Sequence, residues 1–216
     1  MVTKRHVLKN AAMATAQVIV IGVSFFALFR FLLGTIGIEK VGIWSLVLAT
    51  TNVTRISELG FANSVLQFVS RYLAKGESLR ATQVIETATI TMAALGGLAL
   101  FLLYPLLEWA IGRLIPAALQ SEARGLLPFT VVSLWCNMVA STIHSGLDGI
   151  QRADLRSSVL MSSQVIFVGS AFYLVPTNGL NGVAQAQLVQ LSGPLALPVA
   201  YIADAVPPGF RIQPAN

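Results

Sequence analysis

Long apolar stretches interrupted by few charges constrain this chain most strongly. Hydrophobic residues make up 55% of its 216 residues, charged residues make up only 11%, and the mean hydropathy is +0.74. A soluble domain carries about 25% charged residues, so this chain has too few charges to cover a water-facing surface. Disorder is excluded too, because disordered chains have low hydrophobicity. The composition therefore predicts an all-α integral membrane protein.

The apolar stretches divide the chain into six predicted membrane helices. About 20 apolar residues cross a bilayer as a helix, and the composition supplies material for about six such crossings. We expect the third helix to end at Pro105 and the fifth at Pro176, since proline interrupts helices. The predicted spans are approximately 11–33, 43–63, 84–104, 126–147, 159–175 and 182–203, and residues 204–216 form an irregular proline-rich tail.

Lysine and arginine residues divide unevenly between the two predicted sides of the membrane. With the N-terminus inside, the inner side holds nine of them and the outer side three, while Arg30 and Arg55 fall within spans. This positive-inside bias places both termini in the cytoplasm and explains the net charge of +5 without a nucleic-acid partner. Trp44 and Trp109 fall at the outer boundaries, where interfacial aromatic residues are expected.

Arg55 is the most informative single residue. It lies 11 residues after Trp44, which corresponds to roughly 16 Å along a helix and places it near the bilayer midplane. Thr51, Arg55 and Glu58 share one helical face, and Arg55 and Glu58 are close enough in sequence to pair. Two interpretations stay open: a cationic site in a central cavity that suits phosphate or another anion, or a structural ion pair between helices.

Other polar residues within the spans favour packing roles. Arg30 lies near the end of the first predicted span, where its long side chain can reach the interface, and the alternative is a place at the mouth of a cavity. Asn10, Gln17 and Ser24 are spaced by seven and form a polar stripe that favours hydrogen bonding between helices over substrate binding. Ala93 and Gly97 form a small-xxx-small pair, which predicts close helix packing.

Two further groups of polar residues lie in the sixth segment and in the inner loop after the fourth span. The glutamines of the sixth segment either line a cavity or indicate an imperfectly inserted span; they are Gln185, Gln187 and Gln190. We expect the charged residues of the inner loop after the fourth span to be solvated; they are Asp148, Arg152, Asp154 and Arg156.

The sequence carries no recognisable catalytic or metal-binding motif. His144 has no carboxylate or cysteine pattern around it, so we favour a core or interface role. The single cysteine, Cys136, excludes an internal disulfide and any site built on several thiolates. Phosphate-binding-loop, nucleophile-elbow and zinc-protease motifs are absent from the sequence. We therefore expect neither an enzyme nor a bound cofactor or metal.

Five short motifs, in order along the chain, resemble the signatures of oligosaccharide flippases. These are the polysaccharide-biosynthesis exporters of the multidrug/oligosaccharidyl-lipid/polysaccharide superfamily. The motifs are FRFLLG at 29–34, EKVGIWS at 39–45, ELGFAN at 58–63, GIQRAD at 149–154 and GLNGVA at 179–184. Asn10 and Gln17 also match polar positions common in the first helix of this family. The resemblance covers roughly residues 5 to 195.

The resemblance implies one lobe of a two-lobe transporter in the bacterial inner membrane. Such a protein moves a lipid-diphosphate-linked oligosaccharide by alternating access, with Arg30 and Arg55 as candidates for lining the cavity or contacting the diphosphate. Family members usually have 12 to 14 helices, so the six predicted here match the first lobe only, and a cavity needs a second lobe or a homodimer. The alternatives are an inactive remnant or assembly partner, and a drug or cation exporter of the same superfamily that uses Glu58.

Overall fold

The computed structural model describes residues 4–114, 117–150 and 153–191, and gives only the backbone for 4–11, 46–59, 114, 118–119 and 153. Within these residues the fold is helical. The helices are α1 (Lys4–Thr35), α2 (Gly37–Ala74), α3 (Ser78–Leu114), α4 (Ala117–Gly149) and α5 (Ala153–Asn178), followed by a helical segment over residues 180–191.

Four of these helices have a stretch long and apolar enough to cross a membrane. The stretches are Ala12–Thr35, Ser78–Arg113, Gln120–Gly149 and Asp154–Asn178, with hydropathies of 2.2, 2.0, 1.6 and 1.7. This confirms the predicted all-α polytopic membrane protein. The middle of the second predicted span and the end of the sixth lie outside the residues whose side chains are described, so the full set of six spans stays a prediction.

The prediction that Pro105 ends the third helix is wrong. Helix α3 continues through Pro105 to Leu114, and Pro176 likewise lies inside α5, two residues before its end. Proline removes one backbone hydrogen bond, but long apolar helices retain it because neighbouring helices and local adjustments compensate for the loss. Most of the residues between the third and fourth predicted spans, 105–125, are thus helical.

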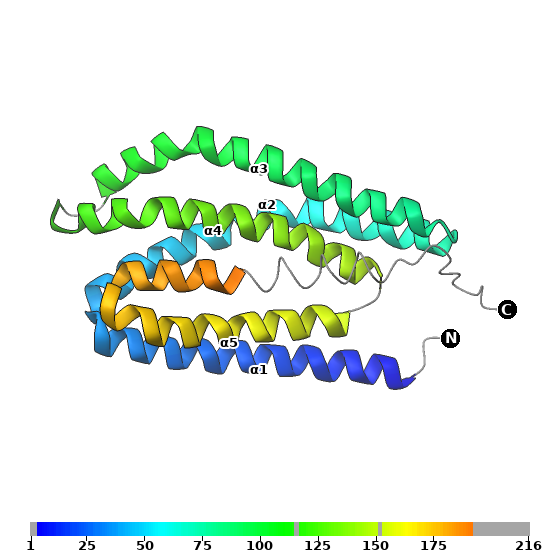
Figure 1. Ribbon diagram of the computed structural model, residues 1–216, viewed down its shortest axis with the longest axis horizontal. Helices are drawn as coiled ribbons and strands as arrows, with labels where there is room; N and C mark the ends of the chain where they lie inside the picture. The colour runs from blue at the N-terminus through cyan, green and yellow to red at the C-terminus, as the bar shows by residue number, and fades with distance from the viewer. Residues whose placement is uncertain (1–3, 115–116, 151–152, 192–216) are drawn as a thin grey trace.

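The helices associate as two groups (Figure 1). Helix α1 runs along α5, whereas α2 and α3 pack against α4 and against each other. One core joins α1, the start of α2, α4, α5 and residues 180–191, and includes Leu28, Trp44 and Phe167. A second core joins α2, α3 and α4, and includes Val69 and Ile85.

A tight reversal connects α2 to α3 and fixes these two helices side by side. Gly76 adopts a φ of +75°, a left-handed conformation that glycine takes without steric cost. Its N–H donates to the Leu73 carbonyl at 3.0 Å, and the Glu77 N–H donates to the Tyr72 carbonyl at 3.0 Å. This pair of bonds is a Schellman motif, which ends α2 and satisfies its last carbonyls.

The small residues of α3 receive a tryptophan of α4, which confirms the predicted close packing. The indole Nε1 of Trp135 donates a hydrogen bond to the Ala93 carbonyl at 2.8 Å. A Cβ added at Gly97 would lie only 3.1 Å from the same nitrogen. The absence of larger side chains at these two positions therefore lets the indole reach the α3 backbone.

We expect Trp135→Phe to lower the free energy of unfolding by about 0.6–1 kcal/mol, the range for hydrogen bonds between membrane helices. Phenylalanine keeps most of the apolar contact and removes the N–H donor. Chemical unfolding in mixed micelles measures this difference. Trp109→Phe is the matched control, because Trp109 is 60% exposed, and an equal loss in both variants would contradict the role of the hydrogen bond.

Candidate functional site

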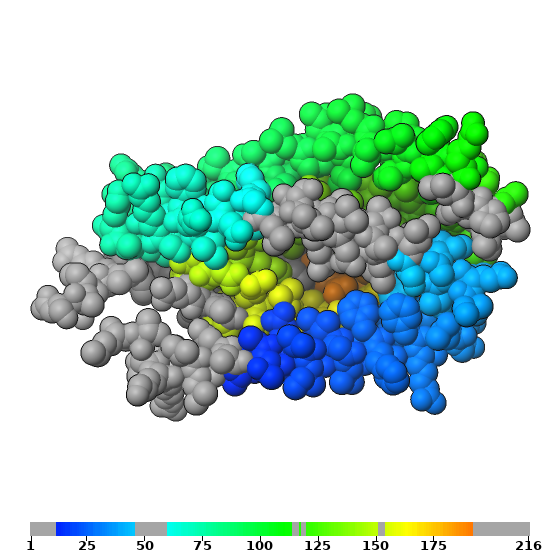
Figure 2. Space-filling model, turned by 180° about the vertical axis from the view of Figure 1, so that it is seen from behind, coloured from blue at the N-terminus to red at the C-terminus, as the bar shows by residue number. Residues whose placement is uncertain are grey.

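The first two helices meet at their connecting turn and then diverge. Near the turn, the rings of Phe29 and Trp44 contact each other in a tilted arrangement with centroids 5.1 Å apart. Beyond this contact α1 follows α5, and α2 crosses to α3 and α4 (Figure 1). Seen from behind, α1 and the later part of α2 lie on opposite sides, with side chains of α5 between them (Figure 2). The face between α1 and α2 is the candidate site.

Trp44 does not occupy the interfacial position that the sequence predicts. Its side chain is 3% exposed and belongs to the core that joins α1 with α5. The backbone turn directs the first residues of α2 inward, which buries an aromatic residue that a linear count of residues places at the membrane surface. Trp109 is 60% exposed and stacks with the Arg113 guanidinium at 5.8 Å, an arrangement that suits an interfacial tryptophan.

The sequence-predicted site residues fall into two sets. Arg30 is exposed on α1 and Gln17 is half-buried on the same helix. Within the described part of the chain, no ion pair of Arg30 is seen. Thr51, Arg55 and Glu58 belong to the middle of α2 and Asn10 to α1, and the side chains of these four lie outside the described residues. Their roles stay predictions.

The sequence did not predict a partly buried polar cluster at the C-terminal end of α4. The Arg156 Nη1 donates to the Asp148 carboxylate at 2.8 Å, and their side chains are 43% and 22% exposed. His144 lies one helical turn before Asp148 and is 8% exposed, in agreement with the expected core role. The prediction of a solvated loop is therefore wrong for Asp148, because the α4–α5 turn brings it against Arg156, whose side chain is still partly exposed.

The hydroxyl of Ser70 fixes this end of α4 to α2. Its Oγ donates to the Gly149 carbonyl at 3.2 Å. Asp154, at the start of α5, is half-buried, whereas Arg152 lies outside the described residues. Opposite charges eight residues apart across a short helix–helix turn were the sequence signal for the Asp148–Arg156 pair.

Glutamines join α5 to residues 180–191. Gln190 Nε2 donates to Gln164 Oε1 at 3.4 Å, and Asn178 Nδ2 donates to Gln185 Oε1 at 2.8 Å. Gln187 is half-buried. The sequence left open whether these glutamines line a cavity or indicate an imperfectly inserted span. In the structure, Gln185 and Gln190 instead pair with side chains of α5.

Another ion pair links the starts of α2 and α4. Lys40 Nζ lies 2.8 Å from Glu122 Oε1, and both side chains are more than a third exposed. Pairs as exposed as this contribute about 0–1 kcal/mol. Among the described residues, no group of three His, Cys, Asp or Glu side chains is placed to hold a metal ion.

Comparison with known families identifies the kind of fold that carries this site. A family described as MatE matches residues 14–173, which is more than half of the chain. The chain belongs to the MatE family. No curated protein and no solved structure matches. MatE proteins are membrane transporters of the multidrug/oligosaccharidyl-lipid/polysaccharide superfamily, and membership in this family implies that this multi-pass membrane protein is a transporter chain.

The MatE match begins within α1, covers the whole of α2, and ends within α5. It therefore includes Gln17, Arg30, Arg55 and Glu58, but leaves out Asn10 and the GLNGVA motif at 179–184. Membership in the superfamily agrees with the resemblance drawn from the sequence, at the level of the superfamily. The distinction between a flippase and a drug exporter depends on the chemistry of the site.

Proposed function

We propose that this chain is a transporter lobe that moves a lipid-diphosphate-linked oligosaccharide across the bacterial inner membrane. The face between the diverging helices α1 and α2 would form one wall of the transport cavity, and a second lobe or a second copy of the chain would form the other. The MatE match supports a transporter. The five flippase-like motifs support the class of substrate.

The observation that carries the proposal is the exposed side chain of Arg30 on α1. A cation on an exposed face of a membrane helix is costly unless it reaches the interface or serves a polar path. On α2, Arg55 supplies a second cation at a greater predicted depth. Either arginine suits a phosphate group of the diphosphate, because guanidinium groups bind phosphate oxygens through paired, charge-assisted hydrogen bonds.

Complementation of a flippase-deficient bacterial strain tests this proposal. We expect the chain to restore surface polysaccharide, alone or with a separately supplied second lobe. Arg55→Ala should lower the restored amount about tenfold, the effect of losing roughly 1.4 kcal/mol of phosphate binding. Arg55→Lys should retain part of the activity, because lysine keeps the charge but loses the paired hydrogen bonds.

Arg113→Ala is the matched control, since Arg113 is an exposed arginine at the far end of α3. Immunoblots of the membrane fraction must show equal amounts of each variant. Full activity of Arg55→Ala would contradict the role of Arg55 in the cavity. Restoration by the 216-residue chain alone would rule out the inactive-remnant alternative. A correctly inserted chain that restores nothing with either arrangement would favour that alternative.

A drug or cation exporter is the second candidate, because MatE membership is equally compatible with it. This function would use Glu58 as the coupling carboxylate. The two candidates differ in the sign of charge that the site prefers: arginines favour an anionic substrate, and a lone carboxylate favours a cationic one. A direct transport measurement with both substrates therefore separates them.

A further inference from the structure

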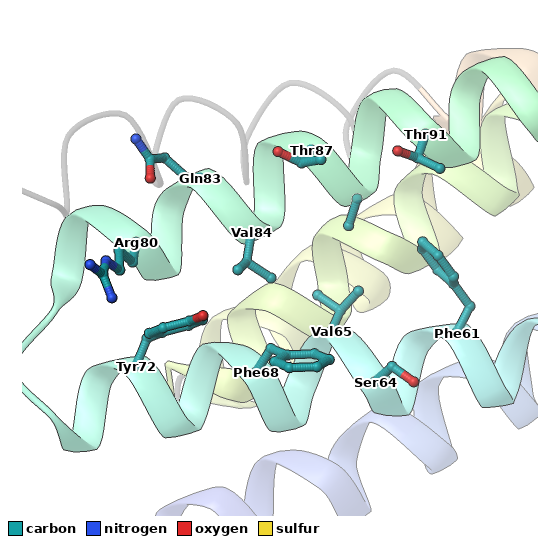
Figure 3. A pocket seen from close by; sticks show the side chains of 11 residues that line it. Phe61, Ser64, Val65, Phe68, Tyr72, Arg80, Gln83, Val84, Thr87 and Thr91 are labelled. Atoms are coloured by element: carbon teal, nitrogen blue, oxygen red, sulfur yellow. The ribbon is translucent and has the colours of Figure 1, made fainter.

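Helices α2 and α3 enclose a groove that the transport proposal does not use (Figure 3). Its volume is about 460 Å³, within the usual range for small-molecule sites. Aromatic and aliphatic side chains line most of it, and a few polar groups accompany them. Among the lining residues are Phe61, Phe68, Tyr72, Arg80, Val84 and Thr91.

The charge of the groove is concentrated at one end. Arg80 lies next to the α2–α3 turn, and Tyr72 faces it from α2 (Figure 3). The Arg80 side chain is 66% exposed, and its Nη1 lies 2.9 Å from the Glu77 carboxylate. Arg71 and Lys75 are exposed beside the same turn, so three basic side chains and one carboxylate, that of Glu77, lie there. The end of the groove at the turn therefore favours an anionic group.

The groove becomes apolar away from the turn. Phe61, Phe68 and Val84 face its middle and far parts, and Thr87 and Thr91 line it from α3 (Figure 3). The Phe68 side chain is 50% exposed, so the groove opens to the surroundings of the helix pair. A ligand here needs a negative head and a hydrocarbon tail.

The length of the groove suits a hydrocarbon chain. Arg80 and Thr91 are 11 residues apart on α3, which is roughly 16 Å and about half of the 30 Å hydrocarbon thickness of a bilayer.

We propose that this groove binds one anionic phospholipid. The phosphate lies at Arg80, supported by the positive field of Arg71 and Lys75, and one acyl chain extends along Phe68 toward Phe61. The positive-inside pattern places this turn at the cytoplasmic leaflet, where anionic headgroups attract basic residues between helices. This inference does not depend on the transported substrate. The lipid would lie in the groove between α2 and α3, whereas the transport proposal uses the face between α1 and α2.

Native mass spectrometry of the purified full chain tests the lipid site. The probes are phosphatidylglycerol and phosphatidylcholine with identical acyl chains, titrated into the detergent-solubilised protein. We expect one phosphatidylglycerol to bind at least fivefold more tightly than phosphatidylcholine. Arg80→Gln should weaken phosphatidylglycerol about fivefold, the effect expected for one arginine at an anionic surface. Arg113→Gln, at the other end of α3, should leave the affinity unchanged.

Filling the groove gives an independent test. Thr87→Trp from α3 and Ser64→Trp from α2 each place a large ring in the groove, and both positions are exposed, so folding should be preserved. Each should abolish the bound lipid, with circular dichroism confirming the helical content. If one variant misfolds, the other and Arg80→Gln decide the outcome.

Three results would overturn the proposal. The first is equal affinity for the two lipids. The second is an equal loss in Arg80→Gln and Arg113→Gln, which would show nonspecific charge attraction. The third is displacement of phosphatidylglycerol by millimolar inorganic phosphate, which would show a phosphate site without a bound acyl chain. None of these results bears on the transport assays.

Discussion

We expect Gly182→Ala to lower the free energy of unfolding by about 3 kcal/mol, at the upper end of the range for overpacking. Gly182 lies where residues 180–191 fold back against α5. A Cβ built there would collide with the Leu174 carbonyl oxygen, would lie 2.6 Å from the carbonyl carbon, and would lie 2.8 Å from the Val175 nitrogen. These are backbone atoms, so no side-chain rotation relieves the collision.

The turn before Gly182 brings the Gly182 backbone close to the backbone of α5. Gly179 adopts a φ of +57°, and its N–H donates to the Val175 carbonyl at 2.8 Å. The following residues Leu180 and Val183 are 4% and 0% exposed, which fixes the helix against α5. The chain has no room to move outward without exposing this core.

Gly169→Ala is the matched control for Gly182→Ala. Gly169 also belongs to this pair of helices, but a Cβ there meets nothing within 4 Å. Alanine in a helix interior is favoured over glycine by about 1 kcal/mol, so Gly169→Ala should be neutral or stabilising. Unfolding in mixed micelles measures both variants. Equal stability of Gly182→Ala and wild type would contradict the packing of residues 180–191 on α5.

The second large effect concerns Gly149 and Val69, which meet where α4 ends against α2. A Cβ at Gly149 would lie 2.7 Å from Val69 Cγ1 and 3.3 Å from the Leu66 carbonyl oxygen. Val69 is fully buried, so its side chain has no space to yield. We expect Gly149→Ala to cost about 2 kcal/mol by overpacking. Val69→Ala should cost about 2 kcal/mol by lost burial and a cavity.

The double variant distinguishes this contact from two unrelated effects. With Val69→Ala present, the alanine at position 149 enters the space that the valine methyl groups occupied. The double variant should therefore be more stable than the sum of the two single effects predicts, by about 1–2 kcal/mol. Strict additivity would contradict the contact between α2 and α4. Gly60→Ala is the control, because a Cβ there meets nothing within 4 Å.

The fold class was predictable because the length and hydropathy of membrane helices follow from bilayer thickness. The small pair Ala93 and Gly97 also predicted a close contact, which Trp135 provides. The motif at 179–184 was recognised only as a resemblance, and the structure supplies its physical reason in the left-handed Gly179 and the close approach at Gly182.

The partners of each helix were not predictable from composition. An apolar segment is hydrophobic on all sides, so its sequence does not indicate that α1 packs on α5 or that Trp44 turns inward. The rule that proline ends a helix also failed at Pro105, because a bundle of neighbouring helices tolerates a missing hydrogen bond.

The candidate site was predictable only in part. The sequence singled out Arg30, and the structure leaves it exposed on α1. The sequence did not predict the Asp148–Arg156 pair, because the pairing depends on the geometry of the α4–α5 turn rather than on how deep each residue lies in the membrane. The grouping of Thr51, Arg55 and Glu58 on one face remains a prediction from helical periodicity.

Transport by the purified chain in proteoliposomes tests the central proposal most directly. One set of vesicles carries a fluorescent lipid-diphosphate oligosaccharide, and its movement is followed by bleaching with a membrane-impermeant reductant. A second set contains a fluorescent organic cation. We predict that the protein, with a second lobe where one is needed, makes the inner-leaflet lipid accessible to the reductant, and that Arg55→Ala slows this movement about tenfold. Export of the cation without movement of the lipid would contradict the proposed flippase and establish the exporter instead.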